Sequence, residues 1–160
     1  MKKVLLSLLF AIIGMASASA QFEAGKKYLG VGLDGIGISY SEYNKFHIGI
    51  GAKAGYMVDQ DIMFIGDLGF NYQNKDAQQV VIGAAGRYFI EQNGIFLQAG
   101  VHYIHEAPNV NDLQITPEVG YCFFLNRHLT IEPSVYYDIS LGHFSDMSKF
   151  GLKIGLGWYF

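Results

Sequence analysis

The stretch GLKIGLGWYF (151–160), which ends the chain, alternates strictly between two kinds of side chain. Its even-numbered residues, from Leu152 to Phe160, are large and apolar, whereas its odd-numbered residues are small or polar and include three glycines. Successive side chains of a β-strand point to opposite faces of the sheet, so this alternation predicts a strand with one apolar face. The predicted strand runs to the final aromatic residue with no polar tail after it.

The same alternation occurs in eight stretches of the chain, and each is long enough to form a strand. The eight stretches are 28–40, 46–56, 62–72, 80–90, 95–103, 113–123, 129–139 and 151–160. The first stretch changes phase near Gly35, where a glycine bulge would switch the register. Short links such as Asn93-Gly94, a strong hairpin signal, alternate with longer ones. This arrangement predicts antiparallel strands with tight turns at one end and loops at the other.

The two faces of these strands indicate what surrounds the sheet. The apolar face holds large side chains and no Asp, Glu, Lys or Arg at any of the assigned positions, while the opposite face is rich in glycine with scattered charges. The interior of an eight-stranded barrel is only just wide enough for side chains to fill it, so the bulky face must point outward, into lipid. We therefore predict an all-β fold, a closed eight-stranded antiparallel up-and-down transmembrane β-barrel. A soluble ligand-binding barrel, such as a lipocalin, does not fit so bulky an apolar face.

Aromatic residues near the strand ends predict two girdles at the membrane interfaces. The girdle residues are Tyr28, Tyr40, Phe46, Tyr56, Phe64, Tyr72, Tyr88, Tyr103, Phe123, Tyr137 and Trp158. Pro117 and Pro133 lie on the predicted lipid face, where each deletes one hydrogen bond of the ladder. We therefore expect each proline near a strand end or a bulge.

The first 20 residues have the three parts of a secretory signal peptide: Lys2 and Lys3, an apolar run, and the small residues ASASA (16–20). We predict export through the Sec pathway, cleavage after Ala20, and a single barrel domain over residues 21–160. The formal net charge is −3, and the sequence has no basic patch that would favour nucleic acid. A single cysteine, Cys122, excludes an internal disulfide, and no motif calls for a cofactor.

The signal peptide, the eight alternating stretches and the terminal LGWYF (156–160) together resemble the small eight-stranded outer-membrane β-barrels of Gram-negative bacteria, of the OmpA/OmpX type. PEVGYCFFLNRHLTIEPSVYY (117–137) is similar to paired strands of such barrels from Bacteroidetes-type bacteria. The resemblance implies an outer-membrane location and contact with membrane lipid and lipopolysaccharide. It also implies a monomer that the barrel-assembly machinery inserts, with Trp158 and Phe160 as the assembly signal.

Charged residues on the inward face are the first candidate functional set. They are Asp34, Lys53, Asp67, Arg87, Glu118, Glu132, Asp138 and Lys153. Isolated charges in a narrow lumen are costly, whereas paired ones are tolerated, so we expect an internal network of salt bridges that plugs the barrel. An ion or solute path, as in a small-solute porin, is the alternative.

Three further motifs are candidates for chemistry. HFS (143–145) resembles the His-x-Ser motif of the lipid A 3-O-deacylases, so His143, Ser145 and, in a different geometry, Asp138 form an alternative catalytic set. His102, His105 and Glu106 are metal-ligand types, but the last two begin a loop and we expect no metal site there. GVGLDG (30–35) matches a dinucleotide-binding pattern but lies within a strand, so we do not expect that function. A structural or surface-interaction role is the leading expectation, with the barrel hydrolase and the porin as alternatives.

Overall fold

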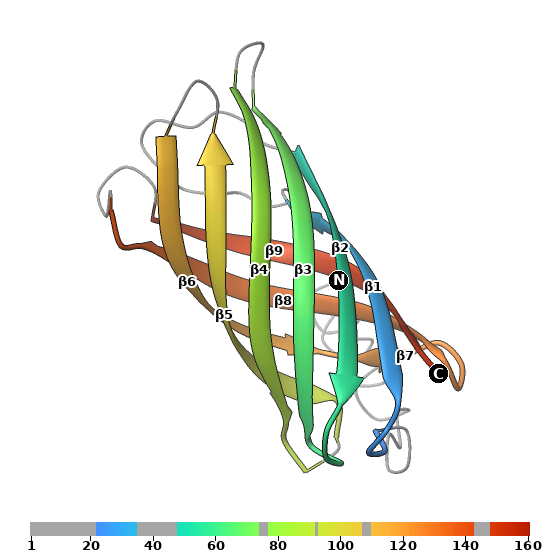
Figure 1. Ribbon diagram of the computed structural model, residues 1–160. Helices are drawn as coiled ribbons and strands as arrows, with labels where there is room; N and C mark the ends of the chain where they lie inside the picture. Colours follow the sequence, from blue (N-terminus) through green and yellow to red (C-terminus); the bar gives the residue numbers. More distant parts are fainter. Residues whose placement is uncertain (1–21, 35–47, 74–76, 92, 107–109, 143–147) are drawn as a thin grey trace, which may run out of the picture.

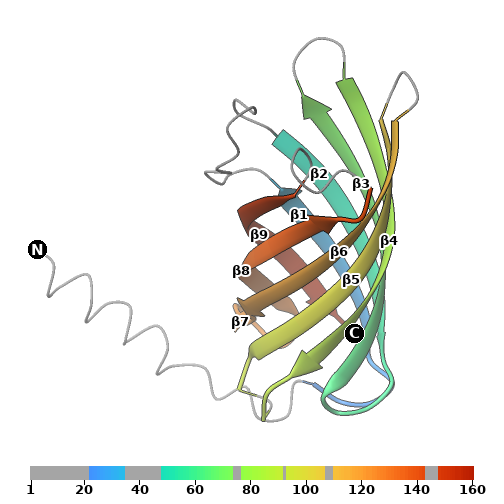
Figure 2. The ribbon, with the colours of Figure 1, turned by 90° about the vertical axis from the view of Figure 1, so that its left-hand side faces the viewer.

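The protein is a β-barrel in the computed structural model, which describes residues 22–34, 48–73, 77–91, 93–106, 110–142 and 148–160. The strands are β1 (Lys27–Asp34), β2 (Ile48–Met57), β3 (Ile62–Gln73), β4 (Ala77–Phe89), β5 (Ile95–Glu106), β6 (Val110–Tyr121), β7 (Phe123–Phe124), β8 (Leu129–Ser140) and β9 (Lys149–Tyr159). Figures 1 and 2 show them inclined around a common axis, and in Figure 1 β8 and β9 cross behind β3 to β5.

The barrel closes completely, and every neighbouring pair is antiparallel. The strand order is β6-β5-β4-β3-β2-β1-β9-β8-β7, and an additional β6–β8 pairing joins the two ends of this series. The two-residue β7 continues the line of β6 beyond Cys122 and pairs with the same partner, so the wall contains eight strands. This confirms the predicted closed eight-stranded architecture.

The C-terminal strand β9 lies against β1, as a closed barrel requires. Tyr28 pairs with Tyr159, and the register continues to Asp34 opposite Lys153. The final residue is also paired, because Lys27 N donates to Phe160 O at 2.8 Å and Phe160 N donates to Lys27 O at 3.0 Å. Closure therefore gives the edges of β1 and β9 the hydrogen-bond partners that an edge in hydrocarbon would lack.

The apolar face points away from the barrel axis, in agreement with the prediction. Phe70 is 67 % exposed and Phe64 61 %, and Trp158 and Phe160 also point outward. Tyr28 is an exception to the predicted girdles: it is 2 % exposed and lies inside the barrel, because Leu29 and Val31 take the outward phase of β1. No helix in the described ranges is long and apolar enough to cross a membrane.

Three short turns meet at the end of the barrel where β1 begins and β9 ends. They are closed by hydrogen bonds from Val58 N to Ile62 O, from Ile90 N to Ile95 O, and from Leu125 N to Leu129 O. Asn93 and Asn126 use their side-chain oxygens to accept backbone N–H groups within two of these turns. We call this the short-turn end. The opposite end, which we call the loop end, is formed by the strand ends that flank residues 35–47, 74–76, 107–109 and 143–147. The predicted bulge at Gly35 lies outside the described residues.

Both prolines interrupt the same junction, the pairing of β6 and β7 with β8, which we call the β6–β8 seam. Its ladder omits the rungs that would hold Pro117 opposite Tyr137 and Pro133 opposite Tyr121. The prolines lie within strands rather than at strand ends, but each coincides with a local gap in the ladder. This is the physical consequence expected of a residue that has no N–H to donate.

Candidate functional site in the barrel lumen

Aromatic and thioether side chains fill the lumen at the short-turn end. Phe22, which precedes β1, is 1 % exposed and stacks on Phe89 with ring centroids 3.9 Å apart. Phe124 and Tyr159 present ring edges to Phe22 at centroid distances of 5.3 and 5.6 Å. The other buried members of this cluster, which we call the aromatic floor, are Tyr28, Met57, Met63, Ile65, Ala85, Phe96 and Cys122.

Arg87 on β4 lies directly against this floor. Its guanidinium carbon is 3.9 Å from the centroid of the Phe96 ring, a cation–π distance. Nη1 donates to Glu132 Oε2 at 2.8 Å, and Nε donates to Gln98 Oε1 at 2.9 Å. The residue is 2 % exposed, so this cation is held entirely by protein groups.

The carboxylate of Glu132, on β8, has donors on both oxygens. Oε2 accepts from Tyr28 OH at 2.9 Å as well as from Arg87. Oε1 accepts from Thr130 Oγ1 at 2.8 Å and from Tyr159 OH at 3.2 Å. Burying an ion pair is costly unless additional hydrogen bonds satisfy both ions, and this constellation supplies them.

A second pair lies higher in the lumen and is joined to the first through Gln98. Gln98 Nε2 donates to Glu118 Oε2 at 3.1 Å, and Lys153 Nζ donates to the same oxygen at 3.4 Å. Lys153 Nζ also lies 4.6 Å from the centroid of the Tyr136 ring. Side chains from β4, β5, β6, β8 and β9 thus form one connected polar chain across the barrel.

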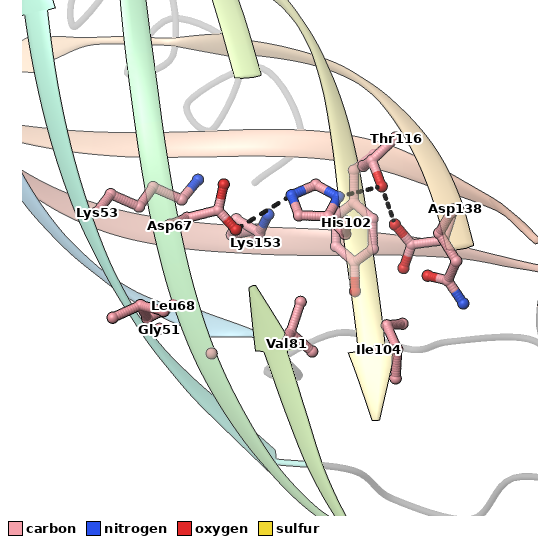
Figure 3. Close-up of a pocket in the computed structure, with 13 residues that line it drawn as sticks. Gly51, Lys53, Asp67, Leu68, Val81, His102, Ile104, Thr116, Asp138 and Lys153 are labelled. Carbon is pink, nitrogen blue, oxygen red and sulfur yellow. Dashed lines mark hydrogen bonds and ion pairs between the residues drawn. The ribbon is translucent and has the colours of Figure 1, made fainter. Parts of the chain in front are cut away.

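Towards the loop end the packing is looser, and a cavity of about 70 Å³ opens among polar side chains. His102 on β5 is one of the residues that line it, with Nε2 3.2 Å from Asp67 Oδ1 and Nδ1 3.0 Å from Thr116 Oγ1. Thr116 Oγ1 donates in turn to Asp138 Oδ1 at 2.6 Å. Figure 3 shows this chain of contacts crossing from β3 through β5 to β6 and β8.

The predicted inward charges separate into several groups. Arg87 meets Glu132, and Lys153 meets Glu118, as ion pairs. Asp67 and Asp138 are linked instead through His102 and Thr116. Lys53 stands directly opposite Asp67 in the β2–β3 register, and both line the cavity. Asp34 lies opposite Lys153 in the β1–β9 register, but its side chain falls outside the described residues.

Several residues that organise the lumen were not among the predicted charges: Phe22, Tyr28, Gln98, His102, Thr116 and Tyr159. Tyr28, Gln98, His102 and Thr116 all lie on the inward phase of their strands, so the alternation itself could have identified them. His102 and His105 do not act together, because His105 is exposed and contacts Asn111 Oδ1 at 2.7 Å. His143 and Ser145 lie outside the described residues, and Asp138, their proposed partner, lies in the lumen bonded to Thr116.

Comparison with known proteins identifies the fold. No protein-family model matches the chain, and no curated protein matches it. Among solved structures, the N-terminal β-barrel domain of Pseudomonas aeruginosa OprF aligns over 86 % of this chain and 98 % of its own, with a TM-score of 0.63 and 10 % identity. Neisserial surface protein A aligns over 86 % and 98 %, with a TM-score of 0.59 and 13 % identity.

The Ail attachment invasion locus protein of Yersinia pestis, in complex with a heparin analogue, aligns over 86 % of this chain and 99 % of its own. Its TM-score is 0.57 at 16 % identity. The chain therefore has the fold of the small eight-stranded outer-membrane β-barrels.

Proposed function

We propose that this protein is a bacterial outer-membrane β-barrel with a structural or surface-interaction role, and that its lumen is closed to solutes. The observation that carries the proposal is the double obstruction of the lumen. The aromatic floor fills the short-turn end, and the Arg87–Glu132 pair lies directly against it. An eight-stranded barrel filled in this way leaves no continuous water path.

The surroundings of the barrel support a membrane location. Large apolar side chains cover the outer surface of every strand from β1 to β6 and of β8 and β9, as a lipid-facing band requires. Residues 1–20 have the pattern of a Sec signal peptide, which would deliver residues 21–160 across the inner membrane. Trp158 and Phe160 face outward on the closing strand, where the barrel-assembly machinery would meet them.

A surface role is the most suitable one for a sealed barrel, because only its loop end and outer wall remain available to partners. Ail, which shares the fold, is described as an attachment protein and was solved with a heparin analogue. For this chain the corresponding partners would be lipopolysaccharide or an external molecule met by the loop end, with the barrel acting as a monomer. The deacylase alternative, with His143 and Ser145, stays a prediction.

Planar-bilayer recording tests the closed lumen. We expect the purified barrel of residues 21–160 to insert without any steady single-channel conductance. A bacterial porin with an open pore, reconstituted in the same way, is the control for the sensitivity of the recording. Steady, sizeable conductance from the barrel itself would overturn the proposal and favour the small-solute porin.

A further inference from the structure

The junction between β1 and β9 differs from the other junctions of the wall because no hairpin connects its two strands. The other neighbouring pairs join strands that follow one another in the chain, with β7 continuing the line of β6. In a hairpin, the type and length of the turn fix the register of the two strands. β1 and β9 are the first and last strands that the structure describes, so their register must be set by something other than a turn.

The residues that face each other across this junction specify its register only weakly. On the lumen side Gly30 stands opposite Gly157, and the outward residues of both strands are large and apolar. Sliding β1 along β9 by two residues can bring Gly30 opposite Gly155 and Leu29 opposite Leu156, which again makes one glycine pair and one apolar pair. Strands rich in glycine are those in which the register is prone to slip.

Glu132 on β8 contacts both of the strands that meet at this junction. Tyr28 of β1 stands directly opposite Tyr159 of β9, and their ring centroids are 5.0 Å apart. Tyr28 OH donates to Glu132 Oε2 at 2.9 Å. Tyr159 OH donates to Glu132 Oε1 at 3.2 Å, so the first and last strands place their hydroxyls on one carboxylate.

The position of this carboxylate is fixed without β1. Arg87 of β4 and Thr130 of β8 each donate to it at 2.8 Å. Glu132 itself lies on β8, which precedes β9 in the chain and pairs with it. The carboxylate is therefore a stationary acceptor that Tyr28 either reaches or misses when β1 meets β9.

Two glycines leave room for the Tyr28 ring to reach that acceptor. A Cβ atom on Gly30 would collide with the Tyr28 hydroxyl. A Cβ atom on Gly157 would collide with Glu132 Oε1 and lie 2.7 Å from Tyr28 Cε2. Because Gly30 and Gly157 stand opposite each other, the ring and the carboxylate share the space above a single glycine rung.

A change of register would separate Tyr28 from Glu132. A slide of one residue would turn the Tyr28 ring towards lipid, because successive side chains of a strand point to opposite faces. A slide of two residues would carry its hydroxyl about 7 Å along the wall, at ~3.4 Å per residue, which is beyond hydrogen-bond reach. In either case the buried carboxylate would lose one of its donors, which is costly for a charge inside the lumen.

We infer that Tyr28 and Glu132 form a register latch for closure of the barrel. The carboxylate, positioned by its other three donors, accepts the Tyr28 hydroxyl only when the first strand meets the last in the native register. The latch thus selects one closed form among those that the glycine-rich junction permits. The inference goes beyond the proposed function and holds whether or not the barrel conducts.

Amide hydrogen exchange of the full barrel in detergent, followed by NMR, tests the latch. Tyr28→Phe removes the hydroxyl and keeps the ring. We expect amides that pair across β1 and β9 to exchange at least tenfold faster in this variant, in line with the loss of a hydrogen bond to a charged group. Amides between β4 and β5, which a turn connects, should keep their rates. Tyr136→Phe removes the hydroxyl of another buried tyrosine, away from this junction, and should leave both sets of rates unchanged.

A contact between α-protons reads the register directly. Lys27 and Phe160 exchange both of their backbone hydrogen bonds. In an antiparallel ladder the next pair, Tyr28 and Tyr159, is then a non-hydrogen-bonded pair with Cα atoms ~4.5 Å apart. The wild-type barrel should show a nuclear Overhauser contact between the α-protons of this pair alone, whereas Tyr28→Phe should add a contact from position 28 to Gly157.

Three results would contradict the latch. They are equal acceleration of exchange at all junctions in Tyr28→Phe, unchanged exchange between β1 and β9, and a Tyr28→Phe barrel that keeps the native α-proton contact alone. Channel conductance would contradict the sealed lumen and leave the latch standing, so the two failures can be distinguished.

Discussion

The two halves of the lumen differ in how completely their buried charged side chains are hydrogen-bonded. At the short-turn end, Arg87 and Glu132 are buried, and both oxygens of the carboxylate have donors. At the loop end, His102 and Asp67 are 15 % and 11 % exposed beside a cavity of about 70 Å³, and one oxygen of Asp67 has no partner among the described residues. A fully satisfied buried polar network makes its surroundings rigid, whereas an unpaired buried polar atom is costly.

Residue size explains why the halves differ. The short-turn half is filled by Phe22, Phe89 and Phe96 together with two methionines. Glycines border both halves, but in the loop half they face an imidazole and a cavity rather than stacked rings. Large rings exclude water and force the ions beside them to pair with protein groups.

The largest loss of stability should come from disrupting the Arg87–Glu132 ion pair at the short-turn end. Arg87→Met leaves the Glu132 carboxylate buried without its cation, which should cost about 3–5 kcal/mol of unfolding free energy. Urea unfolding in detergent, followed by the fluorescence of the single tryptophan, measures the loss.

The matched control for that change is the double variant Arg87→Met with Glu132→Gln. Neutralising both partners removes the uncompensated charge, so the double variant should recover a large part of the stability lost in the single one. Equal losses in the single and double variants would mean that the ion pair is not what stabilises this end.

Removing the Phe22 ring from the aromatic floor should have the next largest effect on stability. Phe22→Ala deletes the ring that stacks on Phe89 and should cost up to about 3 kcal/mol, the lower end of the usual loss for a core phenylalanine. It should also expose the thiol of Cys122, which belongs to the same cluster and is fully buried, to a maleimide reagent.

Phe64→Ala is the control for the aromatic floor. It removes the same kind of side chain as Phe22→Ala, but Phe64 is 61 % exposed on the outer wall. The Cys122 thiol should stay unreactive in that variant. Slow alkylation in both variants would show that other residues seal the short-turn end.

Much of this architecture could be predicted from the alternation alone. A period of two decides which side chains face the lumen, and in the structure the side chains of Arg87, Glu118, Glu132 and Lys153 are shielded from solvent. It does not decide the height at which residues on opposite walls meet, because that depends on the stagger between strands around the barrel. The pairing of Arg87 on β4 with Glu132 on β8 therefore emerges only from the closed structure.

Three residues show what the pattern leaves open. Tyr28 resembled a girdle residue because aromatic side chains at strand ends usually lie at the interface, although its phase relative to Leu29 placed it inside. Phe22 precedes the first strand, where no alternation exists to predict its direction. His102 has the inward phase of its strand but was left out of the predicted charge network, because a count of formal charges treats histidine as neutral. In the structure it links Asp67 to Thr116.

The smallest expected loss of stability comes from the second ion pair, between Lys153 and Glu118. Lys153→Met removes a cation from Glu118, but the Lys153–Glu118 contact is longer, at 3.4 Å, and Gln98 still donates to the same oxygen. We expect a loss of ~1–2 kcal/mol in the urea experiment, clearly below that of Arg87→Met. Lys27→Met, at an exposed position of β1, is the control and should change stability by less than about 0.5 kcal/mol. If Lys153→Met cost as much as Arg87→Met, the Lys153–Glu118 pair would contribute as much to stability as the Arg87–Glu132 pair, and the contrast drawn between the two halves of the lumen would be wrong.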